Sequence, residues 1–225
     1  MARALILSGG VTHDFPALNA ELSGLFGELG LEATVTEDFE GALTNLAGID
    51  LLVVNMLRWT MQVERYADQR EQWGLSPSPQ ARAAITDHVA DGGRLLTFHA
   101  ATICFDDWPE WKDLIGARWV WGQSSHPPFG PITARVHAER HPIVAGLPTS
   151  FALDDEAYGF LDRTDDVVGL VESEHGGTVH PLVWARDFGS GRVVHDALGH
   201  SPDSFRVPAH RRLVTQAVRW LVDDL

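Results

Sequence analysis

The first half of the chain alternates short apolar runs with segments of helical periodicity. The runs predict strands at Ala2–Leu7, Leu31–Val35, Ile49–Val54 and Arg94–Phe98, and the periodic segments predict helices at Phe15–Leu29 and Gln80–Ala90. Runs that are apolar throughout are typical of strands buried on both faces of a parallel sheet. The order of strand, helix and strand therefore predicts right-handed crossovers and helices on both faces of that sheet.

The second half has a different pattern, in which short β-like stretches dominate. These stretches are Ile132–Val136, Ser150–Leu153, Val167–Val171, Pro181–Trp184 and Arg192–Asp196, and an amphipathic helix follows from about Pro208 to Asp224. We expect these stretches to add antiparallel strands to the sheet. Because no repeat, low-complexity tract or linker rich in Pro, Gly or Ser interrupts the sequence, residues 1–225 are predicted to form one domain.

One segment, Arg58–Ser78, is long for a connection and follows the third predicted strand. It contains Trp59, Tyr66 and Trp73. In an open α/β sheet this position lies at the carboxyl ends of the strands, where ligands bind. We therefore expect the insertion to lie near a binding site.

Composition and charge exclude several classes of function. Of 225 residues, 17 are Lys or Arg and 31 are Asp or Glu, which gives a formal net charge of −14. Such a chain repels phosphate backbones and anionic lipid, so neither nucleic acid nor a membrane surface is an expected partner. The single cysteine, Cys104, excludes an intramolecular disulfide and a cysteine-cluster metal site. No apolar stretch reaches the ~18 residues of a membrane helix and the N-terminus lacks a secretory pattern, which predicts a cytoplasmic protein.

Histidine is frequent, with 11 residues against 2 tyrosines. His13, His99 and His200 each follow a strand-like run. A single histidine of this kind is usually a loop residue with a local hydrogen bond, but the carboxyl ends of neighbouring parallel strands meet in one crevice. We therefore predict that the three side chains share a site, to which histidine brings proton transfer or metal binding near neutral pH.

Two acidic clusters are candidate partners for these histidines. Asp106 and Asp107 precede the segment Trp108–Ile115 and are interpreted as the N-cap of a helix. Glu156 follows an apolar strand and precedes Tyr158 in what looks like a loop. Glu156 is either a solvated loop residue or a partner that orients histidine, transfers protons or binds a metal.

Eight short motifs follow one another along the chain, and together they resemble one known family. They are Gly-Gly-x-x-His at 9–13, Phe-His-Ala-Ala-Thr at 98–102, Trp-Lys-Asp-Leu-Ile-Gly at 111–116, Ser-His-Pro at 125–127, His-Pro-Ile at 141–143, Asp-Glu-x-Tyr at 155–158, Pro-Leu-Val-Trp-Ala-Arg-Asp-Phe-Gly-Ser-Gly-Arg at 181–192 and Leu-Gly-His at 198–200. No single motif is specific, but their order over the whole chain resembles the ThuA-like, or trehalose-utilisation, family of the class I glutamine amidotransferase-like superfamily.

This resemblance implies an α/β fold, a flavodoxin-like or class I glutamine amidotransferase-like three-layer sandwich with a mainly parallel sheet. The amidotransferase relatives carry a catalytic cysteine on the sharp turn where this chain has His99, and we expect Cys104, further along, to be a core residue. His200 stands at what resembles the amidotransferase histidine position. Because His99 stands in place of the cysteine of the cysteine–histidine pair, the nucleophile is missing and glutamine hydrolysis through a thioester is excluded.

The resemblance further implies an enzyme of sugar catabolism that acts on a disaccharide or its 3-keto derivative. We expect acid/base chemistry, with or without a metal, by an isomerase, a lyase or a hydrolase. The predicted site consists of His99, His200 and Glu156 as catalytic residues and of His13, His126, Tyr158, Trp121 and Trp184 as residues that bind the substrate.

The alternative is a non-catalytic carbohydrate-binding or regulatory protein on a degenerate amidotransferase scaffold. In such a protein the titratable groups would be scattered or covered by apolar side chains. A divalent metal is the one cofactor that the residue types admit, at His13, His99, His200 and Glu156, although their spacing is no metal signature. The expected partner is a small-molecule carbohydrate, and a homo-oligomer is left open.

Overall fold

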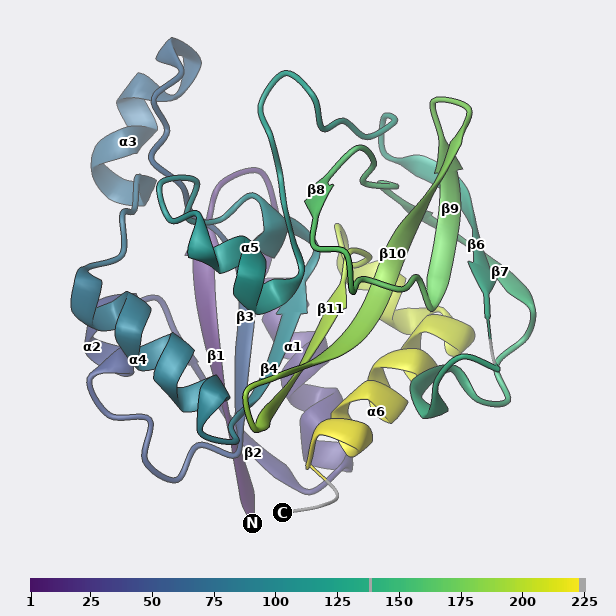
Figure 1. The fold of residues 1–225 in the computed structure, drawn as a ribbon, viewed down its shortest axis with the longest axis horizontal. Helices are drawn as coiled ribbons and strands as arrows, with labels where there is room; N and C mark the ends of the chain where they lie inside the picture. Colours follow the sequence, from purple (N-terminus) through teal and green to yellow (C-terminus); the bar gives the residue numbers. More distant parts are fainter. Residues whose placement is uncertain (138, 223–225) are drawn as a thin grey trace.

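The computed structural model describes residues 1–137 and 139–222 (Figure 1). Within these residues most strands join one nine-stranded sheet, in the order β2-β1-β3-β4-β11-β10-β9-β6-β7. Its strands are β1 Ala2–Gly10, β2 Leu31–Thr36, β3 Leu51–Leu57, β4 Arg94–Phe98, β6 Gly130–Val136, β7 Ser150–Asp155, β9 Val171–His175, β10 Thr178–Phe188 and β11 Gly191–Asp196. A two-stranded sheet pairs β5, Ala117–Arg118, with β8, Asp162–Arg163.

The parallel half of the sheet has the strand order of a flavodoxin-like fold. β1 pairs in parallel with β2 and β3, β4 pairs with β3, and β11 pairs with β4. The parallel strands therefore run β2-β1-β3-β4-β11, which is the 2-1-3-4-5 order of that fold. β10, β9, β6 and β7 extend the sheet with antiparallel pairs. The predicted fold class is confirmed in both halves.

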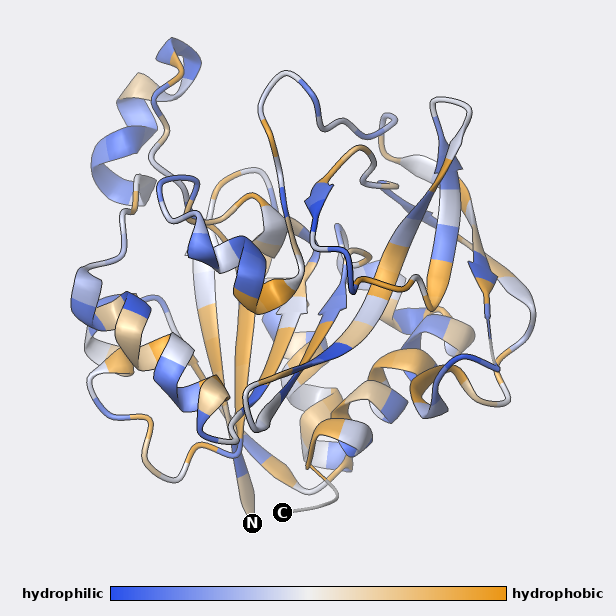
Figure 2. Ribbon diagram, viewed as in Figure 1, coloured by the Kyte–Doolittle hydropathy of each residue, from blue (hydrophilic) through white to orange (hydrophobic). Residues whose placement is uncertain are grey.

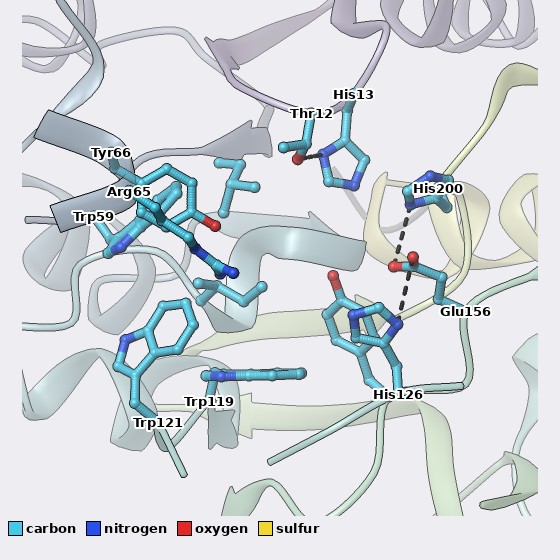
Figure 3. Close-up of a pocket in the computed structure, with 13 residues that line it drawn as sticks. Thr12, His13, Trp59, Arg65, Tyr66, Trp119, Trp121, His126, Glu156 and His200 are labelled. Carbon is cyan, nitrogen blue, oxygen red and sulfur yellow. Dashed lines mark hydrogen bonds and ion pairs between the residues drawn. The ribbon is translucent and has the colours of Figure 1, made fainter. Parts of the chain in front are cut away.

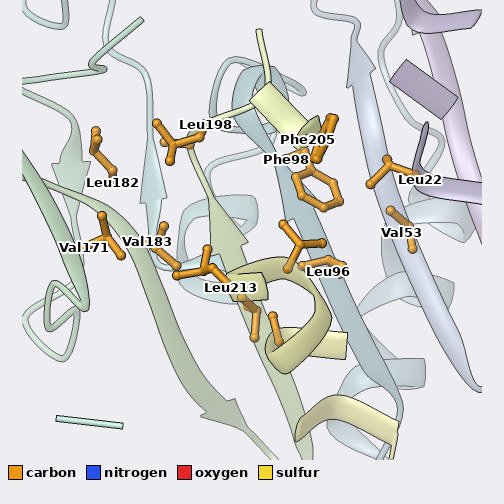
Figure 4. Packing of buried hydrophobic residues seen from close by; sticks show 14 of the residues in the cluster. Leu22, Val53, Leu96, Phe98, Val171, Leu182, Val183, Leu198, Phe205 and Leu213 are labelled. Carbon is orange, nitrogen blue, oxygen red and sulfur yellow. The ribbon is translucent and has the colours of Figure 1, made fainter. Parts of the chain in front are cut away.

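Helices cover both faces of the sheet and enclose two hydrophobic cores (Figures 1 and 2). One face carries α1 Phe15–Glu28 and α6 Pro208–Val222, and the other carries α2 Phe39–Leu43, α4 Pro79–Ala90 and α5 Glu110–Ile115. Leu22, Phe98 and Leu213 belong to the first core (Figure 4), and Ile85 and Trp111 to the second. The predicted continuation of the last helix to Asp224 lies outside the described residues. No helix in the described part of the chain is long and apolar enough to cross a membrane.

The strand expected at Val167–Val171 is wrong in its position. The backbone N–H of Val167 bonds to the carbonyl oxygen of Thr164 at 3.3 Å, which closes a turn. β9 begins only at Val171, after Gly169. Residues 167–169 lead from this turn to the sheet, and Leu170 is the first to bond to β10, through its backbone N–H to the carbonyl oxygen of Val183 at 2.8 Å.

Asp106 and Asp107 do not cap a helix, in contrast to the prediction. α5 begins at Glu110 without a side-chain cap. Asp106 instead accepts hydrogen bonds from the backbone N–H and the hydroxyl of Thr60 (2.8 and 2.9 Å), and Asp107 accepts one from Arg82 at 2.8 Å. The two carboxylates thereby connect the turn after β4 to α4 and to the insertion that follows β3, which contains α3, Ala67–Trp73.

Candidate active site

Three histidines from three strand ends meet at the carboxyl edge of the parallel strands. His13 follows β1, His99 follows β4 and His200 follows β11. The ring centroids are 5.1 Å apart for His13 and His99, 4.6 Å for His13 and His200, and 5.3 Å for His99 and His200. The structure therefore brings together the side chains for which the sequence predicts a shared crevice.

The turns that carry these histidines are tight and need unusual backbone angles. Gly10 has a φ of +133°, and a Cβ atom there would lie 2.2 Å from the carbonyl oxygen of Leu57. His99 has a φ of +37°, a conformation that costs a residue with a side chain about 1–3 kcal/mol. Its Nδ1–H donates to the carbonyl oxygen of Ala197 at 2.7 Å. This bond fixes the ring of His99 against the end of β11.

Glu156 lies at the centre of the histidine cluster. Its Oε2 is 3.4 Å from Nε2 of His99 and 3.2 Å from Nδ1 of His200. Its Oε1 is 3.4 Å from Nδ1 of His126 (Figure 3). One carboxylate thus contacts three imidazoles, which is the arrangement of a coupled proton-transfer site.

Asp155 holds the two chain segments of the site together. Its side chain is fully buried. It accepts hydrogen bonds from the backbone N–H groups of Glu156 and Gly199, both at 2.8 Å, and of His200 at 3.3 Å. The hydroxyl of Ser204 donates to the same carboxylate. These four donors connect the end of β7 to the loop after β11 and so set the position of Glu156 relative to His200.

Burial and mutual contact set the charges of the cluster. Burial opposes ionisation of Glu156, but the hydrogen bonds from His200 and His99 prevail and lower its pKa below the usual range. Burial also disfavours a charge on His99, yet its hydrogen bond to Glu156 and the charge of Asp155 raise its pKa above the ordinary value. Burial and the nearby charges of His99 and His200 lower the pKa of His13 to about 3, which keeps that ring neutral. Opposed shifts of this kind in one cleft are typical of catalytic sites.

The cluster faces a cavity of about 300 Å³, at the lower end of the range for small-molecule sites. The cavity is lined by Thr12, His13, Leu57, Trp59, Arg65, Tyr66, Ile103, Trp119, Trp121, His126, Glu156, Tyr158 and His200. Glu156 and His200 lie on one side of it, and Trp59 and Tyr66 lie on the other (Figure 3). A sugar ring in this cavity would meet proton-transfer groups on one side and aromatic faces on the other.

Four of the five residues predicted to bind substrate line the cavity: His13, His126, Tyr158 and Trp121. Trp121 is 43% exposed, so it lies at the mouth. Tyr158 is buried, and burial together with the charges of Glu156 and Asp155 raises its pKa well above the ordinary value. Its hydroxyl therefore stays protonated and serves as a hydrogen-bond donor.

Trp184 does not reach the cavity, contrary to the prediction. It is fully buried in the middle of β10, and its Nε1–H donates to the carbonyl oxygen of Ile115 at 2.8 Å. Its ring also packs on His195 with a centroid separation of 4.4 Å. Trp184 therefore fills the space between the sheet and α5, and it is a core residue.

His99, which the sequence predicts as a catalytic residue, lies behind the cavity and does not line it. Its side chain is 2% exposed, against 11% for Glu156 and 23% for His200. His99 contacts both of these groups, with 3.3 Å between its Nε2 and Nδ1 of His200. His99 therefore contacts the cavity-lining groups Glu156 and His200 rather than the cavity itself.

The insertion after β3 lies beside the cavity, as expected, although none of its residues was predicted individually to bind substrate. It contributes Trp59, Arg65 and Tyr66 to the lining, and Trp119 is a further lining residue that was not predicted. Trp119 is held by a backbone hydrogen bond to the carbonyl oxygen of Thr102 at 2.7 Å. Its Nε1–H is buried and has no partner among the described residues.

Cys104 is a core residue, as expected. Its Sγ–H donates to the carbonyl oxygen of Met56 at 3.2 Å. Burial raises the pKa of the Cys104 thiol to about 12. Because nucleophilic attack requires a thiolate, Cys104 does not replace the nucleophile of the amidotransferases.

A fully buried histidine in β11 makes the stability of the protein depend on pH. The Nδ1 of His195 lies 2.8 Å from the hydroxyl of Thr97. Burial, with a smaller contribution from the charge of His99, lowers the pKa of His195 to about 3. The unfolded chain binds a proton here below about pH 6.5 and the folded chain does not, so the free energy of unfolding falls as the pH is lowered.

We expect His195→Phe to remove this part of the pH dependence. Phenylalanine fills a similar volume without a titratable group, and Thr97 keeps the carbonyl oxygen of Val194 as an acceptor. Denaturant unfolding of both proteins between about pH 6 and pH 4 should give a slope that is lower in the variant by about 1.4 kcal/mol per pH unit. Equal slopes would show that His195 does not titrate abnormally.

The sheet order and the strand-end cluster define a class of protein, an α/β chain of flavodoxin-like fold with a histidine- and glutamate-lined cavity at its carboxyl edge. The chain belongs to the ThuA family, described as trehalose utilisation, whose family model matches residues 3–221. This description supports a sugar-related role.

Solved structures of the same fold agree with this assignment. A putative ThuA-like protein from Parabacteroides merdae aligns with a TM-score of 0.78 and 18% identity, over 99% of this chain and 90% of that one. A putative ThuA-like protein from Bacteroides uniformis aligns with a TM-score of 0.75 and 20% identity, over 98% of this chain and 91% of that one. A cytoplasmic protein from Salmonella typhimurium aligns with a TM-score of 0.67 and 14% identity, over 97% of this chain and 99% of that one. No curated protein matches the sequence.

Proposed function

We propose that this protein is an enzyme of sugar catabolism that performs acid/base chemistry on a disaccharide or its 3-keto derivative. The observation that carries the proposal is Glu156, a carboxylate within 3.4 Å of three imidazoles at the wall of an aromatic-lined cavity. Four titratable groups, His13, His126, Glu156 and His200, line the cavity, which favours an enzyme over a degenerate binding protein. The family's description supports the choice of a sugar.

Proton transfer in the proposed enzyme uses the groups that are open to the cavity. Glu156 takes a proton from the sugar and shares it with a neighbouring imidazole, so the basicity of the site belongs to the coupled cluster rather than to the carboxylate alone. His126 and His200 contact opposite oxygens of Glu156. Either imidazole can return the proton to a sugar oxygen or carbon, which restores the starting state of the protein.

The test is a turnover screen that follows trehalose, other disaccharides and their 3-keto derivatives by NMR in the presence of the wild-type protein. We expect at least one of these sugars to be consumed. The products distinguish the reactions, because isomerisation keeps one molecule, elimination releases a sugar from an unsaturated partner, and hydrolysis releases two sugars with the addition of water. Saturable binding of a sugar without turnover would contradict the proposal and establish a carbohydrate-binding protein.

A further inference from the structure

The cluster of His13, His99 and His200 has the composition of a metal site. One ring nitrogen from each side chain lies within 4.8 Å of the others. Neutral imidazole is a preferred ligand of divalent zinc, nickel, cobalt and iron. Three imidazole rings at these distances could also form a chain of hydrogen bonds. The direction of the nitrogen lone pairs therefore decides whether the cluster can bind a metal ion.

Backbone carbonyl groups favour the tautomer with the proton on Nδ1 in two of the three rings, and in His13 the Thr12 hydroxyl also lies 3.1 Å from that nitrogen. Nδ1–H of His13 donates to the carbonyl oxygen of Val11 at 3.2 Å, and Nδ1–H of His99 donates to that of Ala197 at 2.7 Å. When the ring is neutral, each bond leaves a lone pair on Nε2. On His99 an ion would therefore take the place of the proton that Nε2 shares with Glu156 at 3.4 Å, since metal binding releases protons from its ligands. A carbonyl oxygen that holds the far nitrogen in this way is the usual outer partner of a metal-binding histidine.

One of these lone pairs has no partner of its own. Nε2 of His13 is buried and makes no hydrogen bond within the described part of the chain. A buried polar atom without a partner is unfavourable and calls for a specific explanation. His13 forms close ring contacts with His99 and His200, so an ion bound among the three rings would satisfy it.

Charge and access also suit a cation. Oε2 of Glu156 lies 3.4 Å from Nε2 of His99 and 3.2 Å from Nδ1 of His200, which places a negative charge beside two of the three rings. His13, His200 and Glu156 line the cavity, whereas His99 lies behind it. An ion held by the cluster would thus have protein ligands on one side and an open position toward the cavity, as catalytic metal sites do.

We propose that His13, His99 and His200 bind one divalent first-row transition-metal ion. Glu156 lies beside this site and, with His126, remains available for proton transfer. Such an ion would act as a Lewis acid toward an oxygen atom in the cavity. Ion binding follows from the geometry alone, whereas the identification of that oxygen with a sugar hydroxyl or carbonyl rests on the proposed function.

The test measures metal binding directly on the full chain. Protein stripped with a chelator is titrated with Zn²⁺ by calorimetry and with Co²⁺ by visible absorption, which reports nitrogen coordination. We expect one ion per chain. Loss of a residue that only supports a metal ligand weakens metal binding by about 10–100-fold. Because His13 and His99 would be ligands themselves, His13→Ala and His99→Ala should each weaken metal binding by at least that factor. His137→Ala is the matched control, because His137 also pairs with a glutamate, Glu172 at 2.7 Å, but does not line the cavity.

Failure of the metal proposal is distinguishable from failure of the proposed function. Absence of saturable binding up to millimolar Zn²⁺ and Co²⁺ overturns the metal site, and so does binding that His13→Ala and His99→Ala leave unchanged. His13→Ala keeps the test valid if His99→Ala does not fold, because His13 lies in a loop and is only partly buried. Turnover of a sugar by chelator-treated protein would exclude a catalytic role for the ion while leaving the proposed enzyme in place.

Discussion

Replacement of Glu156 by glutamine is expected to lower kcat by about 10²–10⁴-fold, the usual contribution of a positioned acid/base group. Glutamine keeps the shape of the side chain but takes up no proton at neutral pH. It also replaces one oxygen by an NH2 group, which cannot accept a hydrogen bond from an imidazole. The contacts of Glu156 with His99, His200 and His126 at 3.2–3.4 Å would therefore lose their charge and part of their bonding.

The same variant gives a readout that needs no substrate. Because Glu156 raises the pKa of His99, we expect the His99 pKa to fall in Glu156→Gln, as followed by NMR titration of the ring. Glu172→Gln is the matched control, since Glu172 lies 2.7 Å from His137 in a comparable pair outside the cavity. Similar losses of kcat in both variants, or an unchanged titration of His99, would remove Glu156 from the mechanism.

The parallel half of the fold could be predicted because its signal is local. β3 is buried along its whole length, and a strand buried on both faces must read as a continuous apolar run. Once the strands are placed, the topology requires their carboxyl ends to meet at one edge. His13, His99 and His200 could be brought together from sequence for this reason, without any knowledge of their contacts.

The rest of the site depends on tertiary contacts that have no local signal. Trp119 and Trp184 are both tryptophans near strands, yet one lines the cavity and the other fills the core. The difference arises from which element each ring faces, and Trp184 faces α5 through its bond to Ile115. Similarly, Glu156 and His200 lie between His99 and the cavity, and both are distant from His99 in the sequence. The position of His99 at the site could therefore be predicted, but its burial behind the cavity could not.

Replacement of Asp155 by asparagine is expected to lower the free energy of unfolding by about 3 kcal/mol, because hydrogen bonds to a buried charge contribute about 1.5–3 kcal/mol each. One oxygen of Asp155 accepts from the backbone N–H groups of Glu156 and His200, and the other accepts from Gly199 N–H and the Ser204 hydroxyl. An amide nitrogen at either position faces two donors and accepts from neither. For a chain of this size the loss corresponds to a decrease in Tm of about 6–12 °C. Asp154→Asn is the control, because this neighbouring carboxylate is exposed.

Asp155 does not line the cavity, so we expect it to affect turnover only by positioning Glu156 and His200. Loss of its bonds to Gly199 and His200 releases the loop after β11 from the end of β7, and a displacement of about 1 Å at a proton-transfer group can cost about 10²-fold in rate. The kcat of Asp155→Asn should therefore remain low at temperatures well below its Tm, where the variant is fully folded, and its pH profile should shift. If kcat recovered completely on cooling, Asp155 would stabilise the fold without positioning Glu156 and His200.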